Sequence, residues 1–174
     1  MPTAWQRDLV AARAALEGWL RGKLQHAQGL EVSELTAPQA SGFSNETLLF
    51  DLGYFEGGQR RSESLVVRIE PTGFQVFPEY DMRAQFECMR LLARVGVPVP
   101  AMRWLEAEDR SVLGAAFYVM ARVAGRAAAD RPLYTMEGWL KEATPAEQAH
   151  GLELCAHVVL GEHLVAGRLD AHDE

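Results

Sequence analysis

Cysteine is scarce in this sequence, which has two cysteines, Cys88 and Cys155, among 174 residues. They lie far apart, and no CxxC, HExxH or Cys/His cluster with metal-ligand spacing accompanies them. This argues against a disulfide framework and is typical of reduced thiols in a cytoplasmic protein. We therefore expect a cytoplasmic location and no metal site.

Long apolar runs and an excess of positive charge are also lacking. No apolar stretch approaches the ~20 residues that span a bilayer, and Asp8 and Glu17 interrupt the N-terminal region where a secretory signal would need an apolar run. The 17 Lys and Arg against 24 Asp and Glu leave a net charge of −7. Because nucleic-acid phosphates require clustered cations, we expect neither a nucleic-acid nor a membrane partner. A local cationic pocket for one nucleotide stays compatible with this charge.

The sequence is otherwise that of an ordinary globular protein, 48% hydrophobic and 24% charged. Apolar spacing predicts helices over 4–24, 80–94, 136–141 and 145–164. Alternation and β-branched residues predict strands over 31–35, 46–52, 64–70, 102–106 and 116–123. Gly53 and the Gly57-Gly58 pair predict a long hairpin loop between the second and third strands.

Strands that follow one another in sequence favour an antiparallel sheet. We predict an α+β fold: a five-stranded antiparallel sheet with one packed helix, an N-terminal helix and a C-terminal helical extension. The predicted organisation is an N-terminal helix over 1–29, a sheet lobe over 30–124, and a linker with further helices over 125–174. The apolar face of the last helix (Leu152, Leu154, Val158, Val159) predicts self-association or a partner.

Small polar residues fill the turn between the first two predicted strands, from Ser41 to Asn45. Glycine in such a turn permits backbone N–H groups to point at an anion. Taken alone, the stretch is more typical of an ordinary hairpin turn.

The strand over 64–70 places Val66 and Arg68 on one face and Leu65, Val67 and Ile69 on the other, because strand side chains alternate. An apolar residue followed two positions later by a cation could cover a flat base and reach its phosphates. The alternative is a surface arginine on an exposed sheet face.

Two further features have the same ambiguity. Gln85 falls on the inward side of the 80–94 helix, where a buried amide needs a hydrogen-bond partner such as Arg68. The strand that includes Phe117–Val123 runs into a linker, so backbone groups at its end are free to pair with an adenine edge. Read alone, it is an apolar strand.

In their order and spacing, these features resemble the N-lobe of the aminoglycoside phosphotransferase and choline kinase family, which has a protein-kinase-like fold. The nearest branch is the set of phosphotransferase domains fused to acyl-CoA dehydrogenases. Gly42–Thr47 is similar to the family's G-x-S-N-x-T phosphate loop, and Arg68 stands at the position of its strand cation. Gly96–Pro100 and Phe117–Met120 match its stretch between helix and hinge. The resemblance covers roughly 41–160.

The resemblance implies binding of ATP (or GTP). Ser44 and Asn45 would lie over the β-phosphate, and Arg68 would pair with the α- and β-phosphates. The Ala121 carbonyl and the Val123 N–H would meet the adenine, with Met120 as gatekeeper. The implied nucleotide-binding residues are Gly42, Phe43, Ser44, Asn45, Val66, Arg68, Gln85, Met120, Ala121 and Val123.

The sequence departs from the family at two places. Gln85 stands where the family has the helix glutamate that holds the strand cation, and an amide cannot supply a charge-assisted bond. The catalytic H-G-D-x-x-x-x-N segment is absent, so we assign no catalytic residue and expect Mg²⁺ and a small-molecule acceptor only with a full C-lobe. We therefore expect the ATP-binding lobe of a phosphotransferase, truncated before its catalytic loop. The alternative is a non-catalytic kinase-like module that binds a nucleotide or a protein.

Overall fold

The computed structural model describes residues 7–38, 45–72, 80–124, 136–137 and 139–146. The chain divides into two compact units, one of Met1–Leu91 with Pro100–Gly125, and one of Leu92–Val99 with Arg126–Glu174. The first unit contains the sheet. Within its described residues, the second contains the short helix α3 (Trp139–Glu142).

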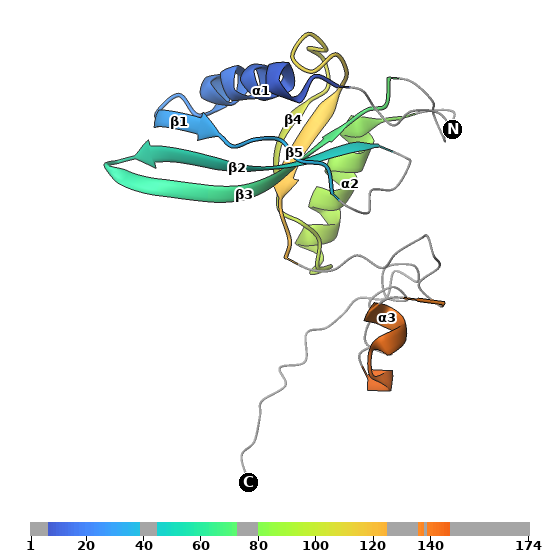
Figure 1. Cartoon of the computed structure of the whole chain (residues 1–174). Coiled ribbons are helices and arrows are strands. Elements are labelled where there is room, and N and C mark those ends of the chain that lie inside the picture. The colour runs from blue at the N-terminus through green and yellow to red at the C-terminus, as the bar shows by residue number, and fades with distance from the viewer. Residues whose placement is uncertain (1–6, 39–44, 73–79, 125–135, 138, 147–174) are drawn as a thin grey trace. The chain divides into compact units, whose positions relative to one another are not determined.

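The first unit is built on an antiparallel sheet, which confirms the predicted α+β fold. Its strand order is β1-β2-β3-β5-β4, and each strand pairs antiparallel with its neighbour (Figure 1). Because β3 pairs with β5, residues about 50 positions apart become neighbours. The strands are β1 (Gln28–Val32), β2 (Glu46–Glu56), β3 (Gln59–Ile69), β4 (Met102–Glu106) and β5 (Phe117–Ala121).

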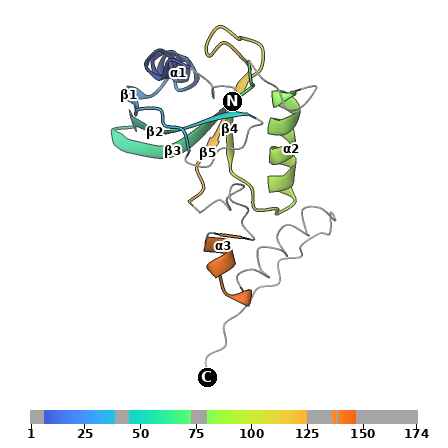
Figure 2. The ribbon, with the colours of Figure 1, turned by 45° about the vertical axis from the view of Figure 1, so that its right-hand side comes forward.

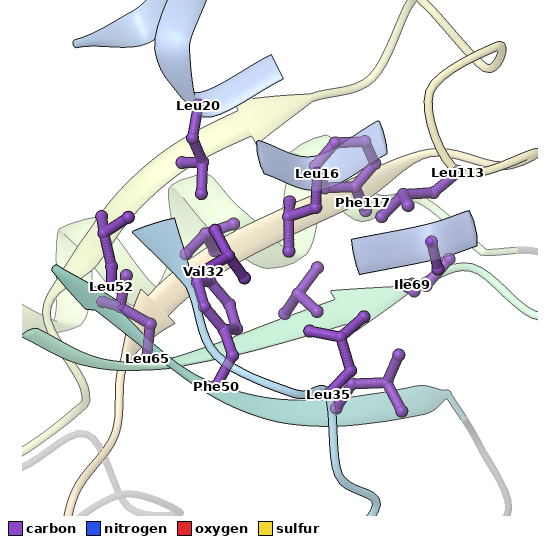
Figure 3. Packing of buried hydrophobic residues seen from close by; sticks show 14 of the residues in the cluster. Leu16, Leu20, Val32, Leu35, Phe50, Leu52, Leu65, Ile69, Leu113 and Phe117 are labelled. Atoms are coloured by element: carbon purple, nitrogen blue, oxygen red, sulfur yellow. The ribbon is translucent and has the colours of Figure 1, made fainter. Parts of the chain in front are cut away.

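Each face of the sheet packs against a different helix (Figure 2). Helix α1 (Leu9–Lys23) covers one face with Leu16 and Leu20, which are fully buried. Figure 3 shows the main core on this side, to which the alternate strand residues contribute. As predicted, Leu65, Val67 and Ile69 belong to this core: their exposure is 0%.

Helix α2 (Met82–Arg94) contributes Met82 and Phe86 to a second, smaller cluster on the other face. Their partners are Ala116 and Tyr118, which alternate with the core residues of β5. The two faces of β5 therefore serve two different clusters.

The connection between β2 and β3 corrects the predicted long hairpin loop. The two strands run to Glu56 and Gln59, and Gly57-Gly58 alone forms the turn. Both glycines have positive φ, 57° and 77°, as the type I′ turn of a tight hairpin requires. Gly53, which was expected to begin the loop, pairs with Ser62 inside the ladder.

Two predicted boundaries also move. Helix α1 begins at Leu9 rather than Ala4, because the Asp8 carboxylate accepts hydrogen bonds from the N–H groups of Val10 and Ala11 as an N-cap. Strand β1 begins at Gln28 rather than Glu31 and ends at Val32. The predicted 145–164 helix and its apolar face fall almost wholly outside the described residues.

The free edge of β1 is occupied by side chains of α1. Arg13 Nε donates to the Val32 carbonyl at 2.8 Å, and Glu17 Oε2 accepts from the Val32 N–H at 3.1 Å. Arg21 Nη2 donates to the Leu30 carbonyl at 3.3 Å. Because the backbone groups of this edge are already paired, the edge is a poor template for strand addition.

Among the helices in the described ranges, none combines the length and apolar character needed to cross a bilayer.

Candidate functional site

The candidate site is the face of β2, β3 and β5 opposite to the main core. Directly paired residues on antiparallel strands share a face. Two rows therefore cross these three strands: an apolar row of Leu49, Val66 and Met120, and a polar row of Thr47, Arg68 and Tyr118. The structure thus brings together three residues expected at a nucleotide site, Val66, Arg68 and Met120.

Both rows are partly accessible. Arg68, Met120, Thr47 and Leu49 are half-buried, while Val66 is 7% exposed. A flat apolar strip therefore lies directly beside a guanidinium. This arrangement can stack on an aromatic base and neutralise anionic groups attached to it.

The polar row places Arg68 beside Tyr118. The two residues are paired in register on the same face of the sheet. The Tyr118 ring is 2% exposed and packs against Phe86 of α2, with ring centroids 6.1 Å apart and ring planes at 60°. Burial raises the pKa of Tyr118, and the nearby positive charge of Arg68 opposes that rise. The phenol is therefore protonated at neutral pH.

The residues after β5 are anchored to the sheet at the rim of the site. The Arg122 N–H donates to the Ser64 carbonyl at 2.9 Å, and Arg122 Nη2 donates to Ser64 Oγ at 3.0 Å. Ser64 Oγ in turn donates to Asp51 Oδ1 at 2.6 Å, and Arg122 Nη2 lies 3.3 Å from that oxygen. This cluster holds the strand end in place through three strands.

At this strand end, successive backbone N–H groups point toward opposite neighbouring strands. Ala121 N–H donates to the Ala101 carbonyl at 2.8 Å, toward β4, whereas Arg122 N–H points toward β3. Within the described part of the chain, no residue outside the sheet ladder donates to the Ala121 carbonyl or accepts from the Val123 N–H. Val123 is 65% exposed. These two groups can therefore meet a ligand edge.

Of the predicted phosphate loop, Gly42–Thr47, the structure describes the last three residues. Asn45 is 5% exposed and comes immediately before β2. Next to it, the buried Glu46 accepts hydrogen bonds from Nε and Nη2 of Arg7 at 2.8–2.9 Å. The end of the loop is thus anchored from the segment before α1. Gly42, Phe43 and Ser44 lie outside the described residues.

Gln85 is half-buried on α2, one residue before the buried Phe86. It thus lies on the helix that packs beside the polar row. Its pairing with Arg68 stays a prediction.

The sequence interpretation did not single out Tyr118. Alternation already groups Tyr118 with Met120 on one face of its strand. Its partner could not be found in this way, because Arg68 is 50 positions away and the β3–β5 pairing is a tertiary property. No group of three or more His, Cys, Asp and Glu able to hold a metal ion occurs within the described ranges.

Comparison with known proteins agrees with this geometry. A model of the phosphotransferase enzyme family (APH) matches residues 36–171. Acyl-CoA dehydrogenase family member 10 of Mus musculus is 30% identical over 140 residues, which are 79% of this chain and 12% of that protein. The resemblance drawn from the sequence is thereby confirmed, and the family match includes both rows of the site.

Proposed function

Since the chain belongs to the phosphotransferase enzyme family, we propose that its sheet lobe binds ATP (or GTP) on the face that carries the apolar and polar rows. The observation that supports this most strongly is the adjacency of these rows. Val66 and Met120 are paired in register, and Arg68 lies next to Val66 on the same face of β3. A nucleotide needs the same two surfaces side by side: an apolar surface for its base and a cation for its phosphates.

In this proposal, Leu49 and Val66 cover the base, and Met120 borders it. The Ala121 carbonyl accepts from the exocyclic amine of adenine, and the Val123 N–H donates to a ring nitrogen. The Arg122 cluster keeps these groups at a constant distance from the sheet. Arg68 pairs with the α- and β-phosphates, while Ser44 and Asn45 lie over the β-phosphate.

The proposed reaction of the complete enzyme is transfer of the γ-phosphoryl group to a hydroxyl of a small molecule. This chemistry needs an aspartate at the acceptor and Mg²⁺ ligands, and the sequence contains no H-G-D-x-x-x-x-N segment. The chain spans 12% of the length of the mouse relative. In this proposal, phosphoryl transfer, Mg²⁺ binding and recognition of the acceptor depend on C-lobe residues of the complete enzyme.

We further propose a cytoplasmic location. Cys88 is exposed and free, which suits a compartment that keeps thiols reduced.

Calorimetric titration of the 174-residue chain with ADP tests the proposal. Arg68→Ala should weaken ADP binding by about tenfold to a hundredfold, because a charged contact to phosphate is lost. Arg61→Ala is the matched control: Arg61 is exposed, on the same strand and far along the ladder from the site. Its affinity should equal that of the wild type.

Two results would count against this function. Absence of ADP binding at millimolar concentration would favour the non-catalytic module that binds a protein. Equal ADP affinity of Arg68→Ala and wild type would remove Arg68 from the phosphate site.

A further inference from the structure

The predicted phosphate loop enters the sheet at Glu46, the first residue of β2. Glu46 is 6% exposed and is paired with Ile69 of the main core, so its side chain lies on the face opposite to the candidate site. The next residue, Thr47, is paired with Arg68 in the polar row on the site face. Glu46 is therefore a point at which the core face of the sheet can control the phosphate end of the site.

Arg7 holds Glu46 on the core face. Its Nε donates to both carboxylate oxygens at 2.9 Å, and its Nη2 donates to Oε2 at 2.8 Å. Its Nη1 donates to the Leu113 carbonyl, in the turn that precedes β5. Because a guanidinium is planar, contacts from all three nitrogens fix both its position and its plane. The carboxylate of Glu46 is fixed together with it.

The chemistry of this pair favours a role in orientation. The two side chains are only 17% and 7% exposed, so both charges lose most of their hydration. An apolar pair of similar volume often stabilises a core equally well or better. Apolar contacts have no preferred direction, whereas a forked ion pair holds one geometry. Beside the apolar core, such a pair is suited to fix the direction in which a strand begins.

We propose that Arg7 is a positioning residue for the phosphate end of the nucleotide site. Through Glu46, it fixes the start of β2 and thereby the place at which the two flanking residues, Asn45 and Thr47, meet the phosphates. This inference rests on the proposed nucleotide site. It makes phosphate binding depend on the segment before α1, which contacts the sheet from the opposite face. The apolar row begins further along β2, at Leu49, and should depend less on Arg7.

The test compares ADP with adenosine, which lacks phosphates, by calorimetry on the same 174-residue variants. Arg7→Met keeps an unbranched side chain and removes all three donors. ADP affinity should fall about threefold to tenfold, within the range for residues that act on a site through another residue. Adenosine affinity should stay unchanged. Val67→Ala is the control for lost stability: Val67 is fully buried in the main core, and its replacement should leave ADP affinity at the wild-type value.

Glu46→Gln separates positioning from a simple effect of charge. If Arg7 acted only by attracting the phosphates, removal of the negative charge of Glu46 would strengthen ADP binding. If Arg7 acts by positioning, Glu46→Gln should weaken ADP binding, because an amide cannot accept the forked contact with both of its side-chain atoms. In Arg7→Met, adding Glu46→Gln should then cause no further loss of ADP affinity.

The outcomes separate this inference from the proposed function. Equal ADP affinity in Arg7→Met and wild type, equal losses for ADP and adenosine, or tighter ADP binding by Glu46→Gln would each overturn the positioning role while nucleotide binding stands. If the wild type binds no ADP, both fall as functional statements. Nitrogen-15 relaxation of the Asn45 and Thr47 amides without nucleotide then tests the anchor alone: Arg7→Met should increase their mobility, and an unchanged mobility would refute the anchor.

Discussion

Arg7 binds Glu46 through two of its guanidinium nitrogens, and its third nitrogen, Nη1, donates to the Leu113 carbonyl. One side chain thereby joins the segment before α1, the first residue of β2 and the turn that precedes β5. The side chains of Arg7 and Glu46 are 17% and 7% exposed. A pair so well enclosed is costly to break, because the remaining charge keeps no equivalent partner.

Replacement of Arg7 tests this anchor. Arg7→Ala should lower the free energy of unfolding by about 3 kcal/mol, since Glu46 would remain buried without its cation. Chemical denaturation monitored by circular dichroism measures the change. Arg83→Ala is the control: its partner Glu108 is 83% exposed, and such pairs contribute at most about 1 kcal/mol. Equal losses in the two variants would contradict the structural role of Arg7.

Alanine substitution should have opposite effects on stability at two glycines, Gly58 in the β2–β3 turn and Gly18 inside α1. Gly58→Ala should destabilise the fold by about 1–2 kcal/mol, because alanine is strained at a φ of 77°. Gly18→Ala should stabilise it by about 0.5–1 kcal/mol, because Gly18 lies inside α1 and an added Cβ would meet nothing within 4 Å. Thermal unfolding of both variants measures the difference. Shifts of the same sign would show that the turn is not of this type.

The lowered pKa of Glu106 predicts that the stability of the fold depends on pH. Its carboxylate accepts a hydrogen bond from Trp19 Nε1 at 2.8 Å, and this bond is the main reason that its pKa lies below the ordinary value of 4.5. A depressed folded-state pKa contributes stability that is present above the unfolded pKa and is lost as pH falls through the folded one. Trp19→Phe should therefore cost more free energy of unfolding at pH 7 than at pH 3. An equal cost at both values would disprove the contribution of Glu106.

Neighbouring valines on β3 distinguish the two faces of the sheet. Val67→Ala should cost about 2 kcal/mol of stability, because Val67 is fully buried in the main core. It should leave ADP affinity unchanged. Val66→Ala should weaken ADP binding, because Val66 belongs to the apolar row. Denaturation and calorimetry on both variants test this, and equal ADP affinities would remove Val66 from the base site.

Local patterns were enough for much of the fold. The alternation over 64–70 correctly placed Leu65, Val67 and Ile69 in the core, and the predicted strand over 102–106 has the bounds of β4. The hairpin was wrong because Gly53 was interpreted as the start of a turn. Inside a long two-stranded ladder, a glycine opposite Ser62 is tolerated, and nothing in the neighbouring sequence shows that the ladder continues.

The amino-acid sequence alone was sufficient for the family, the sheet and the face on which Val66 and Arg68 lie. These depend on short-range spacing and on motif order, which can be seen without coordinates. The neighbours of the charged groups needed the folded chain: Tyr118 beside Arg68 across two strands, Glu46 with Arg7, and Glu106 with Trp19. Each pair joins residues that are 39 to 87 positions apart. Strand register and helix packing bring them together, and no local pattern encodes those distances.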